Sequence, residues 1–254
     1  MAARWPRRLW VVRHGESAAN LAYVRAHLDK AHEIEVEHRD VDVPLSPLGE
    51  AQAMALGRWF AALPPHERPD VVLSSPYLRA RRTALLVEEA GGLAPDRVVH
   101  CTDERLRERE PGILDRLTAL GVADAFPQQA ELRRLLGKFY HRPPGGESWC
   151  DVILRLRSAL DTISLHHAEH RVLIVAHQVV VLCLRYLLEG LDEEKVLAID
   201  AASEVANCSI TEYALGVGPD GREGLQLVRY NFTAPLEAAG EPVTTAPDAK
   251  VAVR

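Results

Sequence analysis

A short apolar run near the N-terminus, Leu9-Trp10-Val11-Val12, stops at Arg13-His14-Gly15. Its apolar and partly β-branched residues indicate a buried strand, and the polar stretch up to Asn20 indicates that a helix begins directly after it. In an open α/β sheet the carboxyl ends of the strands face the ligand crevice, and the N-terminus of a following helix offers backbone N–H groups to an anion. An Arg beside a His at this junction therefore predicts an anion site whose imidazole acts as nucleophile, acid or base. The alternative is an ordinary loop contact, and the rest of the chain has to decide between the two.

Two later apolar runs end in the same way. Val71-Val72-Leu73 leads into Ser74-Ser75-Pro76 and then into a helix with Arg79 in its first turn. The run over residues 171–176 indicates the most deeply buried strand, and it delivers His177-Gln178 at its carboxyl end. Taken alone, this histidine is equally compatible with a hydrogen-bonded core residue. If a parallel sheet brings the three strand ends together, two arginines and two histidines surround one anion, as the transfer of a phosphoryl group requires.

The remaining pattern predicts alternating strands and helices. Ser46-Pro47 places an N-cap hydroxyl and a first-turn proline at the start of a helix. Further strands are expected over residues 97–101, 205–215 and 225–230, where short apolar runs recur. The charged stretch 29–43 is either a loop over the mouth of the crevice or a solvated connection, and its lack of periodicity favours the second.

A helical insertion interrupts this pattern at about residues 112–146. Its helical periodicity is broken near Gly121 and Pro127, which predicts two helices that form a lid. We therefore expect a single domain over residues 1–233 that includes this insertion. The segment 234–254 is rich in Ala, Pro, Glu and Thr, and we expect it to be a loose tail.

The charge balance excludes several classes of function. A formal net charge of -6 and a pI near 6.0 argue against general binding to nucleic acid or to an anionic membrane. No stretch approaches the roughly 20 apolar residues of a membrane span, and the first apolar run is too short for a signal peptide, so we expect a cytoplasmic protein. The four cysteines lie far apart without C-x-x-C spacing, which speaks against a disulfide framework and a zinc site.

The loop from Asp103 to Gly112 is dense in acids and arginines. Such a loop is most often a surface segment whose ion pairs add little stability. A carboxylate set among arginines is also a candidate general acid, and Glu108 and Glu110 are the two candidates here.

Taken together, the chain resembles the histidine phosphatase superfamily, the phosphoglycerate-mutase-like proteins, over roughly residues 9–230. The matching motifs are Arg13-His14-Gly15-Glu16-Ser17 with Asn20, Pro44-Leu45-Ser46-Pro47-Leu48-Gly49, Ser74-Ser75-Pro76 with Arg79, Ala80 and Thr83, Leu106-Arg107-Glu108, and the strand that ends at His177. The resemblance implies an α/β fold, a three-layer αβα sandwich with a mostly parallel central sheet and with the helical insertion over the active site.

The resemblance also implies the catalytic roles. His14 would attack phosphorus and become a phosphohistidine, and Glu108 would protonate the leaving oxygen and then activate water. A neutral imidazole is a competent nucleophile near pH 7, and dividing the transfer into two steps lowers each barrier. Glu110 is the competing acid, but Glu108 follows Leu106 with the spacing of the family. No metal ion is required.

The phosphate pocket follows from the same resemblance. Arg13, Arg79 and His177 would bind the phosphoryl oxygens and complete the catalytic set, with Asn20 as a further donor. Arginine suits this role because it stays charged and matches phosphate geometry. Gln178 stands where many members have glycine, which affects the shape of the pocket, although its backbone N–H can still face the phosphate.

These roles predict a metal-independent phosphatase that acts on a small phosphorylated metabolite. The alternative is a mutase, which would use 2,3-bisphosphoglycerate as cofactor, but the basic and aromatic segments that bind phosphoglycerate are not recognisable. A non-catalytic phospho-ligand-binding protein is a third possibility, and its expected signature is the loss of His14 or Glu108, both of which are present. Without a mutase activity no cofactor is expected. A dimer through an exposed edge strand remains open.

Overall fold

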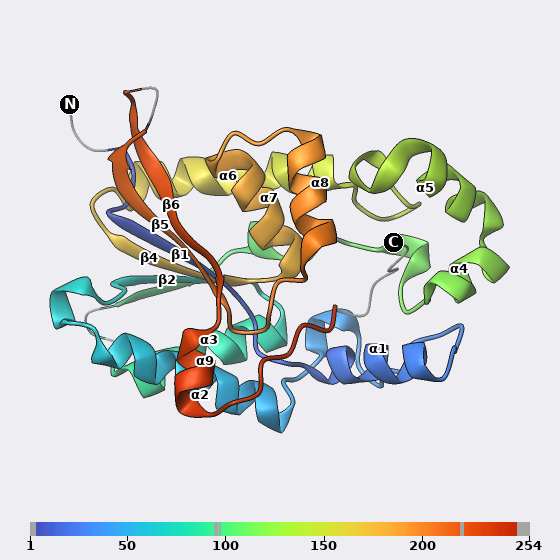
Figure 1. Ribbon diagram of the computed structural model, residues 1–254, viewed down its shortest axis with the longest axis horizontal. Helices are drawn as coiled ribbons and strands as arrows, with labels where there is room; N and C mark the ends of the chain where they lie inside the picture. The colour runs from blue at the N-terminus through green and yellow to red at the C-terminus, as the bar shows by residue number, and fades with distance from the viewer. Residues whose placement is uncertain (1–3, 94–95, 97, 219–220, 248–254) are drawn as a thin grey trace.

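The central element of the fold is a six-stranded sheet with the strand order β3-β2-β4-β1-β5-β6. The computed structural model describes residues 4–93, 96, 98–218 and 221–247 (Figure 1). The strands are β1 (Arg8–Arg13), β2 (Val71–Ser74), β3 (Val99–Thr102), β4 (Arg171–Ala176), β5 (Ile210–Val217) and β6 (Glu223–Phe232). The helices are α1 (Ala18–Leu28), α2 (Pro47–Ala62), α3 (Leu78–Gly91), α4 (Ala119–Ala125), α5 (Pro127–Tyr140), α6 (Trp149–His166), α7 (Gln178–Leu188), α8 (Glu193–Ala202) and α9 (Ala234–Ala239), with the short 3-10 helices η1 (Asp40–Asp42), η2 (Pro65–Glu67), η3 (Glu104–Leu106) and η4 (Gly112–Leu114).

The pairing of the strands brings several polar strand ends to one edge. β1 pairs in parallel with β4, where Arg13 lies opposite Ala176, and β2 pairs in parallel with both β4 and β3. β5 runs antiparallel to β1, and β6 runs antiparallel to β5. The prediction of a mostly parallel central sheet is therefore confirmed. Since β1, β2, β3 and β4 run in the same direction, the residues that follow them emerge at the same edge of the sheet.

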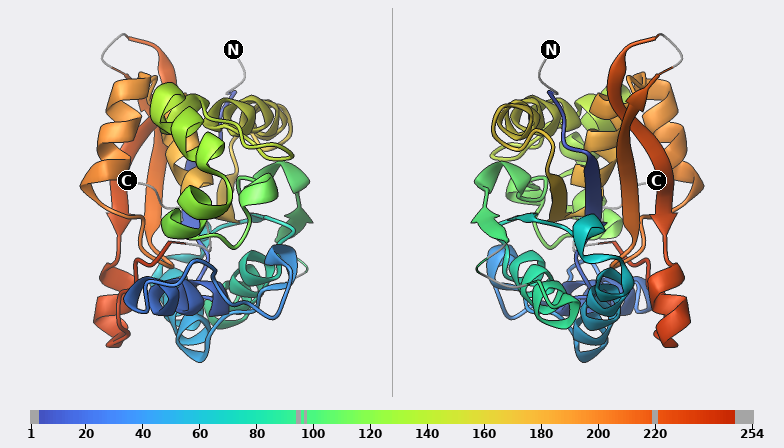
Figure 2. Two further views of the ribbon diagram at one scale, coloured as in Figure 1. Left: turned by 90° about the vertical axis from the view of Figure 1, so that its right-hand side faces the viewer. Right: turned by 90° about the vertical axis from the view of Figure 1, so that its left-hand side faces the viewer.

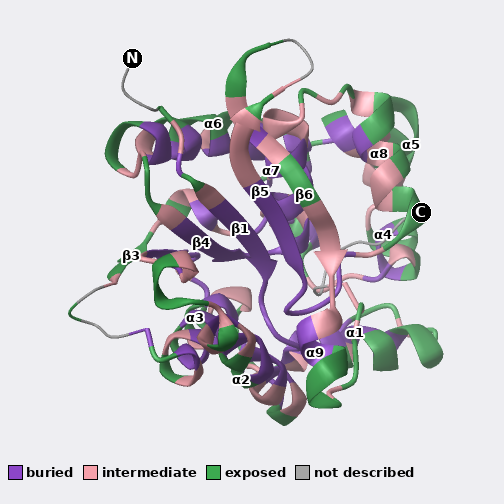
Figure 3. Ribbon diagram, turned by 60° about the vertical axis from the view of Figure 1, so that its left-hand side comes forward, coloured by how far each residue is buried: buried purple, intermediate pink, exposed green. Residues whose placement is uncertain are grey.

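The alternation of side chains along β1 divides the core into two layers. Leu9 and Val11 face one cluster, which includes the buried residues of α6 and α7. Trp10 and Val12 face the other cluster, which includes residues of α2, α3 and α9. Trp10 packs edge-on against Phe60 of α2, with ring centroids 5.4 Å apart. Helices cover both faces of the sheet (Figure 1), and β1 and β4 are buried along almost their whole length (Figure 3). The sandwich predicted from the sequence is thus the observed architecture.

The helical insertion consists of α4 and α5, which lie beside the sandwich at the end where the parallel strands terminate (Figures 1 and 2). The predicted break near Pro127 is present, because Phe126 separates the two helices. The predicted break at Gly121 is absent, since Gly121 lies inside α4. A Cβ at this glycine would come within 2.0 Å of the carbonyl oxygen of His32, so the residue serves a close backbone contact. A second irregularity occurs at Gly137, where φ is 76°.

The segment after β6 differs from the loose tail predicted by its composition. Residues 234–239 form α9, whose Leu236 is fully buried in the core. The following segment runs back across α2, where the side-chain amide of Gln52 donates to the carbonyl of Pro242 at 2.9 Å and to the hydroxyl of Thr244 at 3.0 Å. Residues 248–254 of the predicted tail lie outside the described residues.

The boundaries of other elements shift by a few residues. The third strand covers Val99–Thr102 rather than 97–101, of which residue 97 is not described, and the fifth begins at Ile210 rather than at residue 205. Helix α8 was not predicted, since its sequence has no clear apolar face. Within the described part of the chain, no helix is long and apolar enough to cross a membrane.

Candidate active site

His14 follows directly after β1 and is completely buried. Its Nδ1 lies 2.7 Å from the carbonyl oxygen of Gly15, and the Nε of Arg79 donates to its Nε2 at 3.2 Å. A carbonyl only accepts and a guanidinium only donates, so Nδ1 carries the proton and Nε2 carries the lone pair. The side-chain amide of Asn207 donates to the His14 carbonyl oxygen at 3.0 Å and fixes the backbone. The neighbours thus select the tautomer in which Nε2 is the unprotonated nitrogen.

The turn after β1 is held by close backbone packing. A Cβ at Gly15 would lie 2.4 Å from the carbonyl oxygen of Gly49, so only glycine fits here without a shift. The Gly15 N–H donates to the hydroxyl of Thr83 at 3.0 Å, and that hydroxyl donates to the carbonyl of Arg79 at 2.7 Å. This chain of hydrogen bonds joins the turn that carries the histidine to the first turn of α3.

Arg79 is fully buried at the start of α3. Its Nη1 contacts Asp40 twice, at 2.6 Å to the carbonyl oxygen and at 2.9 Å to Oδ1. Asp40 belongs to η1, inside the charged stretch 29–43, so this part of the stretch reaches the active site and is not merely a solvated connection. The contact with Asp40 prevents the Arg79 side chain from rotating freely and so keeps its guanidinium oriented toward His14.

His177 lies beside His14, with ring centroids 5.2 Å apart. It caps α7, and its Nε2 lies 2.8 Å from the hydroxyl of Ser75, the residue that follows β2. The ring of Tyr77 lies edge-on to His177 at 5.2 Å and 5.0 Å from the guanidinium carbon of Arg79. Burial, followed by the charges of nearby acids, raises the pKa of Tyr77 to about 12, so its hydroxyl stays protonated at neutral pH.

Arg13 and Asn20 are both fully buried and both contact the segment after α9. Arg13 donates through Nη1 to the carbonyl of Val205 at 2.6 Å and through Nη2 to the carbonyl of Ala246 at 2.5 Å. The side-chain amide of Asn20 donates to the same Ala246 carbonyl and to that of Pro247, both at 2.9 Å. A carbonyl oxygen of the chain itself therefore occupies donors that suit an anionic oxygen.

Glu108 lies in the loop after η3 and is 1% exposed. Its Oε1 accepts the backbone N–H of Arg109 at 2.6 Å, and its carbonyl accepts from Arg155 at 3.2 Å. Arg155 is fixed by two hydrogen bonds to Glu147, at 2.9 and 3.0 Å. Burial by itself would raise the pKa of Glu147, but the hydrogen bonds from Arg155 outweigh this and hold it below its ordinary value. This ion pair fastens the loop to α6.

Glu110, the competing acid, lies in the same loop and is half-buried. Burial raises its pKa, and the carboxylates of Asp40 and Asp115 add to the effect. Its backbone N–H donates to Glu147 at 3.1 Å, so the same ion pair also positions this residue. Both carboxyl groups thus stay candidates, while Glu108 is the more deeply buried of the two.

Gln178 is the first residue of α7, and its side-chain amide donates to Glu204. The side chain therefore points toward the end of α8, and its backbone N–H belongs to the unbonded first turn of a helix. Such N–H groups bind anions. The glutamine at this position thus leaves the backbone donor where the family pattern places it.

The structure brings His14, Arg79 and His177 together, as the strand ends predicted. Asn207 and Asp40 are site residues that the sequence did not reveal. Asn207 precedes Cys208, whose φ of 54° marks a tight turn into β5, but nothing in the local pattern connects this turn with β1. The expected absence of a metal ion stays a prediction, although among the described residues no cluster of three His, Cys, Asp or Glu residues is placed to hold one.

Two histidines and an arginine, gathered where the parallel strands end and beside a helical insertion, define an anion-binding type of α/β site. The chain belongs to the histidine phosphatase superfamily (branch 1), whose family model matches residues 9–231. The resemblance inferred from the motifs is thereby confirmed.

Relatives of this chain are named both as phosphatases and as mutases. It is 31% identical over 206 residues to "Putative phosphoserine phosphatase 2" of Hydrogenobacter thermophilus, covering 81% of this chain and 88% of that one. It is 27% identical to "Probable phosphoglycerate mutase GpmB" of Yersinia enterocolitica over 231 residues, which cover 90% and 94% of the two chains. The solved structure of the α-ribazole phosphatase from Shigella flexneri superposes with a TM-score of 0.67 at 21% identity, covering 89% of this chain and 97% of that one, and so supports the fold.

Proposed function

We propose that this protein hydrolyses a small phosphate monoester through a phosphohistidine formed on Nε2 of His14. The observation that carries the proposal is the tautomer of this buried histidine. The Gly15 carbonyl holds the proton on Nδ1, and Arg79 faces Nε2, so the lone pair already points at a cationic group suited to phosphate. Because His14 and Arg79 are already oriented, they do not have to reorient during the reaction.

The first step transfers the phosphoryl group to the enzyme. The Nε2 lone pair of His14 forms a bond to phosphorus while the bond from phosphorus to the ester oxygen breaks. Glu108 donates its proton to the leaving oxygen, which departs as an alcohol. Arg13, Arg79 and His177 bind the three equatorial oxygens, where charge accumulates in the transition state.

The second step releases inorganic phosphate. The ionised Glu108 accepts a proton from water as the water oxygen bonds to phosphorus, and the bond from phosphorus to Nε2 breaks. Glu108 is then protonated again and His14 is neutral, so the cycle closes. The positive charges in this scheme belong to the protein, and we therefore expect EDTA to leave the rate unchanged.

Phosphate release from a panel of phosphorylated metabolites tests the proposal. The assay is run with and without 2,3-bisphosphoglycerate, and isomerisation of 3-phosphoglycerate is followed in parallel. Release that is independent of the bisphosphate supports a phosphatase. Isomerisation that requires it would instead make the protein a mutase, in line with the name of one relative. Rapid quenching should also trap a phosphoprotein that is labile to acid and stable to alkali, and its absence would contradict the phosphohistidine.

A further inference from the structure

Three carboxyl groups gather beside the proposed phosphate site. Asp40 contacts Arg79 at 2.9 Å and Arg79 contacts Nε2 of His14 at 3.2 Å, so one guanidinium group separates this carboxylate from the histidine. Asp115, which follows η4, lines the same narrow cavity as Asp40. Glu110 is the third member, because the charges of both other carboxylates act on it. The three acids come from separate segments and meet at the edge of the site.

Backbone contacts hold the segments that carry these acids. The N–H of Ile34 donates to the carbonyl of Arg116 at 2.7 Å and so joins the stretch 29–43 to the segment after η4. The loop that carries the third acid turns at Gly112, whose φ is 59° and where a Cβ would lie 2.2 Å from the carbonyl oxygen of Pro144. The backbone thus keeps the acids close together, although their like charges repel one another.

The negative charge of this cluster is only partly compensated. Asp40 shares Arg79 with the proposed phosphate. Arg116 lies 3.8 Å from Asp115, but the two side chains are 41% and 40% exposed, where an ion pair contributes little. Within the described residues, Glu110 has no ion-pair partner. Burial raises the pKa of Glu110 and of Asp115, and the charge of Asp40 raises both further. A bound cation would relieve this repulsion.

The hydroxyl of Tyr77 belongs to the same cluster. This residue is 7% exposed, and its ring lies 5.0 Å from the guanidinium carbon of Arg79. The charges of Asp40 and Glu110 act on the hydroxyl, which places it beside these acids. Its backbone N–H donates to Ser75 at 3.3 Å, whereas the hydroxyl itself has no hydrogen-bond partner among the described residues. Because buried tyrosine hydroxyls usually have a partner, this one indicates that a ligand binds beside the acids.

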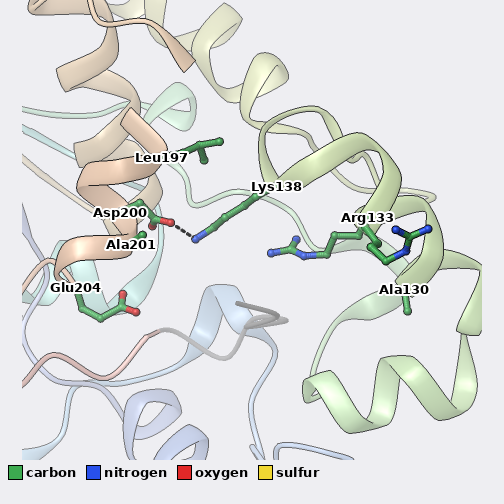
Figure 4. A pocket seen from close by; sticks show the side chains of 8 residues that line it. Ala130, Arg133, Lys138, Leu197, Asp200, Ala201 and Glu204 are labelled. Carbon is green, nitrogen blue, oxygen red and sulfur yellow. Dashed lines mark hydrogen bonds and ion pairs between the residues drawn. The ribbon is translucent and has the colours of Figure 1, made fainter. Parts of the chain in front are cut away.

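The ligand that suits this cluster is an organic cation. Carboxylates accept hydrogen bonds and a phenol oxygen accepts as well, so an ammonium group with three N–H donors matches them. A metal ion suits them less, since in the described part of the chain no three His, Cys, Asp or Glu residues are placed to hold one. The larger cavity, of about 430 Å³ between α5 and the end of α8, selects neither sign of charge, because residues of both signs line it, among them Arg133, Lys138, Asp200 and Glu204 (Figure 4). The acid cluster, in contrast, favours a cation.

We infer that an ammonium group of the substrate binds at Tyr77, Asp40, Glu110 and Asp115. The preferred substrate is then the phosphate monoester of a short amino alcohol, with its amine close to the ester oxygen, because only one guanidinium group separates Asp40 from His14. Its phosphate contacts Arg79, and its ammonium group compensates the charge of the acids. This inference rests on the proposed function, and it names the substrate class of the same site.

The test compares substrates that differ only in the ammonium group. O-Phosphoethanolamine and 2-hydroxyethyl phosphate differ by the exchange of ammonium for hydroxyl, and O-phosphoserine and 3-phosphoglycerate differ in the same way. p-Nitrophenyl phosphate, which has no amine, serves as the reference for catalysis. For the native enzyme we expect kcat/KM for phosphate release to be at least about 10-fold higher for the ammonium member of a pair, the gain expected for a charge-assisted hydrogen bond.

The variants then assign this preference to the cluster. Asp115→Asn keeps the shape of the side chain and removes its charge. The ratio of kcat/KM for O-phosphoethanolamine to that for 2-hydroxyethyl phosphate should therefore fall by about 10-fold or more. Tyr77→Phe keeps the ring and should lower this ratio by about 2- to 10-fold, as expected for a neutral hydrogen bond. Asp161→Asn, on α6 and with its side chain 71% exposed, removes the same charge elsewhere and should leave the ratio unchanged.

Two failures of different kinds are distinguishable. If no phosphate ester is hydrolysed, p-nitrophenyl phosphate included, the proposed function is wrong and the inference fails with it. If p-nitrophenyl phosphate is hydrolysed but the native enzyme shows no preference within either pair, the inference alone is overturned. A preference that persists unchanged in both Asp115→Asn and Tyr77→Phe, with circular dichroism showing a native fold, would overturn it as well. Should Asp115→Asn not fold, the ratio in Tyr77→Phe decides.

Discussion

Thr244→Val probes the segment after α9 without touching a proposed catalytic residue. The Thr244 hydroxyl donates to Oδ1 of Asn207 at 3.0 Å and accepts from Gln52 at 3.0 Å. Valine has nearly the same shape but forms neither bond. Each hydrogen bond contributes about 0.5–1.5 kcal/mol net, so the contact of this segment with the protein should weaken by about 1–3 kcal/mol. Gln52 keeps its other acceptor, the carbonyl of Pro242 at 2.9 Å.

The expected result follows from competition between the substrate phosphate and the segment after α9 for the same donor side chains. Under the proposed function, the substrate phosphate and the Ala246 carbonyl both use Arg13 and Asn20. Only molecules in which the segment is released can bind phosphate, so the apparent dissociation constant is the intrinsic one divided by the released fraction. A weakening of about 1–3 kcal/mol raises the ratio of released to bound segment by about 5- to 150-fold. KM should fall by at most the same factor, because the effect ends once the released form predominates. The value of kcat should not decrease.

Steady-state kinetics with p-nitrophenyl phosphate measure this effect, and the inhibition constant of inorganic phosphate measures it without chemistry. Both constants should fall together. Thr245→Val, at the exposed neighbouring position, is the matched control and should leave both unchanged. A KM and an inhibition constant that stay at the native values, or that rise, would show that the segment does not compete with phosphate and would refute the reasoning.

Four further predictions concern the proposed nucleophile, the proposed acid and the structural contacts around them. His14→Ala should abolish turnover of every phosphate ester while circular dichroism shows an intact fold, and residual turnover above about 1% of native would point to another nucleophile. Glu108→Gln should slow the hydrolysis of an alkyl phosphate far more than that of p-nitrophenyl phosphate, whose leaving group needs no proton; equal losses would move the acid role elsewhere. Gly49→Ala should destabilise the fold by about 3 kcal/mol or more in urea unfolding, because the new Cβ would lie 1.9 Å from the carbonyl oxygen of Glu16, and a native midpoint would contradict this packing. Glu147→Gln should reduce the dependence of the free energy of unfolding on pH in the acid range. The pKa of Glu147 is lowered in the fold, so its contribution to stability is present above the ordinary value of 4.5 and is lost as pH falls through the lower native pKa. An unchanged pH dependence of unfolding in the acid range would refute this.

The side chains of the candidate site were predictable because they lie where local patterns change. His14, Arg79 and His177 each follow an apolar run and precede or begin a helix, and the parallel pairing of β1, β2 and β4 converts these separate junctions into one site. A run of three to five apolar residues is a local signal, and the common edge of a parallel sheet is a general rule. These two pieces of information suffice to gather the side chains.

The residues that position the site were less predictable, since their contacts are long-range and use backbone atoms. Asn207 binds the carbonyl of His14, and Asp40 offers its own carbonyl to Arg79. The hydrophobic periodicity of the sequence does not predict such contacts. Arg109 lies in a loop whose composition predicted a solvated surface segment, yet it is 6% exposed, and its Nη1 donates to the carbonyl of Glu147 at 3.0 Å. For the segment after α9, composition predicted disorder, whereas hydrogen bonds to Gln52 and Arg13 hold residues 242–246 in place.

The strand order has a consequence for how the enzyme is made. β1 leaves the ribosome first, but its two neighbours in the sheet, β4 and β5, are translated in the last third of the chain. The strand that ends at His14 must therefore wait through most of synthesis before either side is paired, and such non-local pairing is slow. A nascent fragment that stops before Asn207 lacks the side chain that binds the His14 carbonyl, and it lacks Cys208, Ile210 and Leu236 of the cluster around Trp10. The order thus couples the placement of the buried His14 imidazole to the completion of the fold.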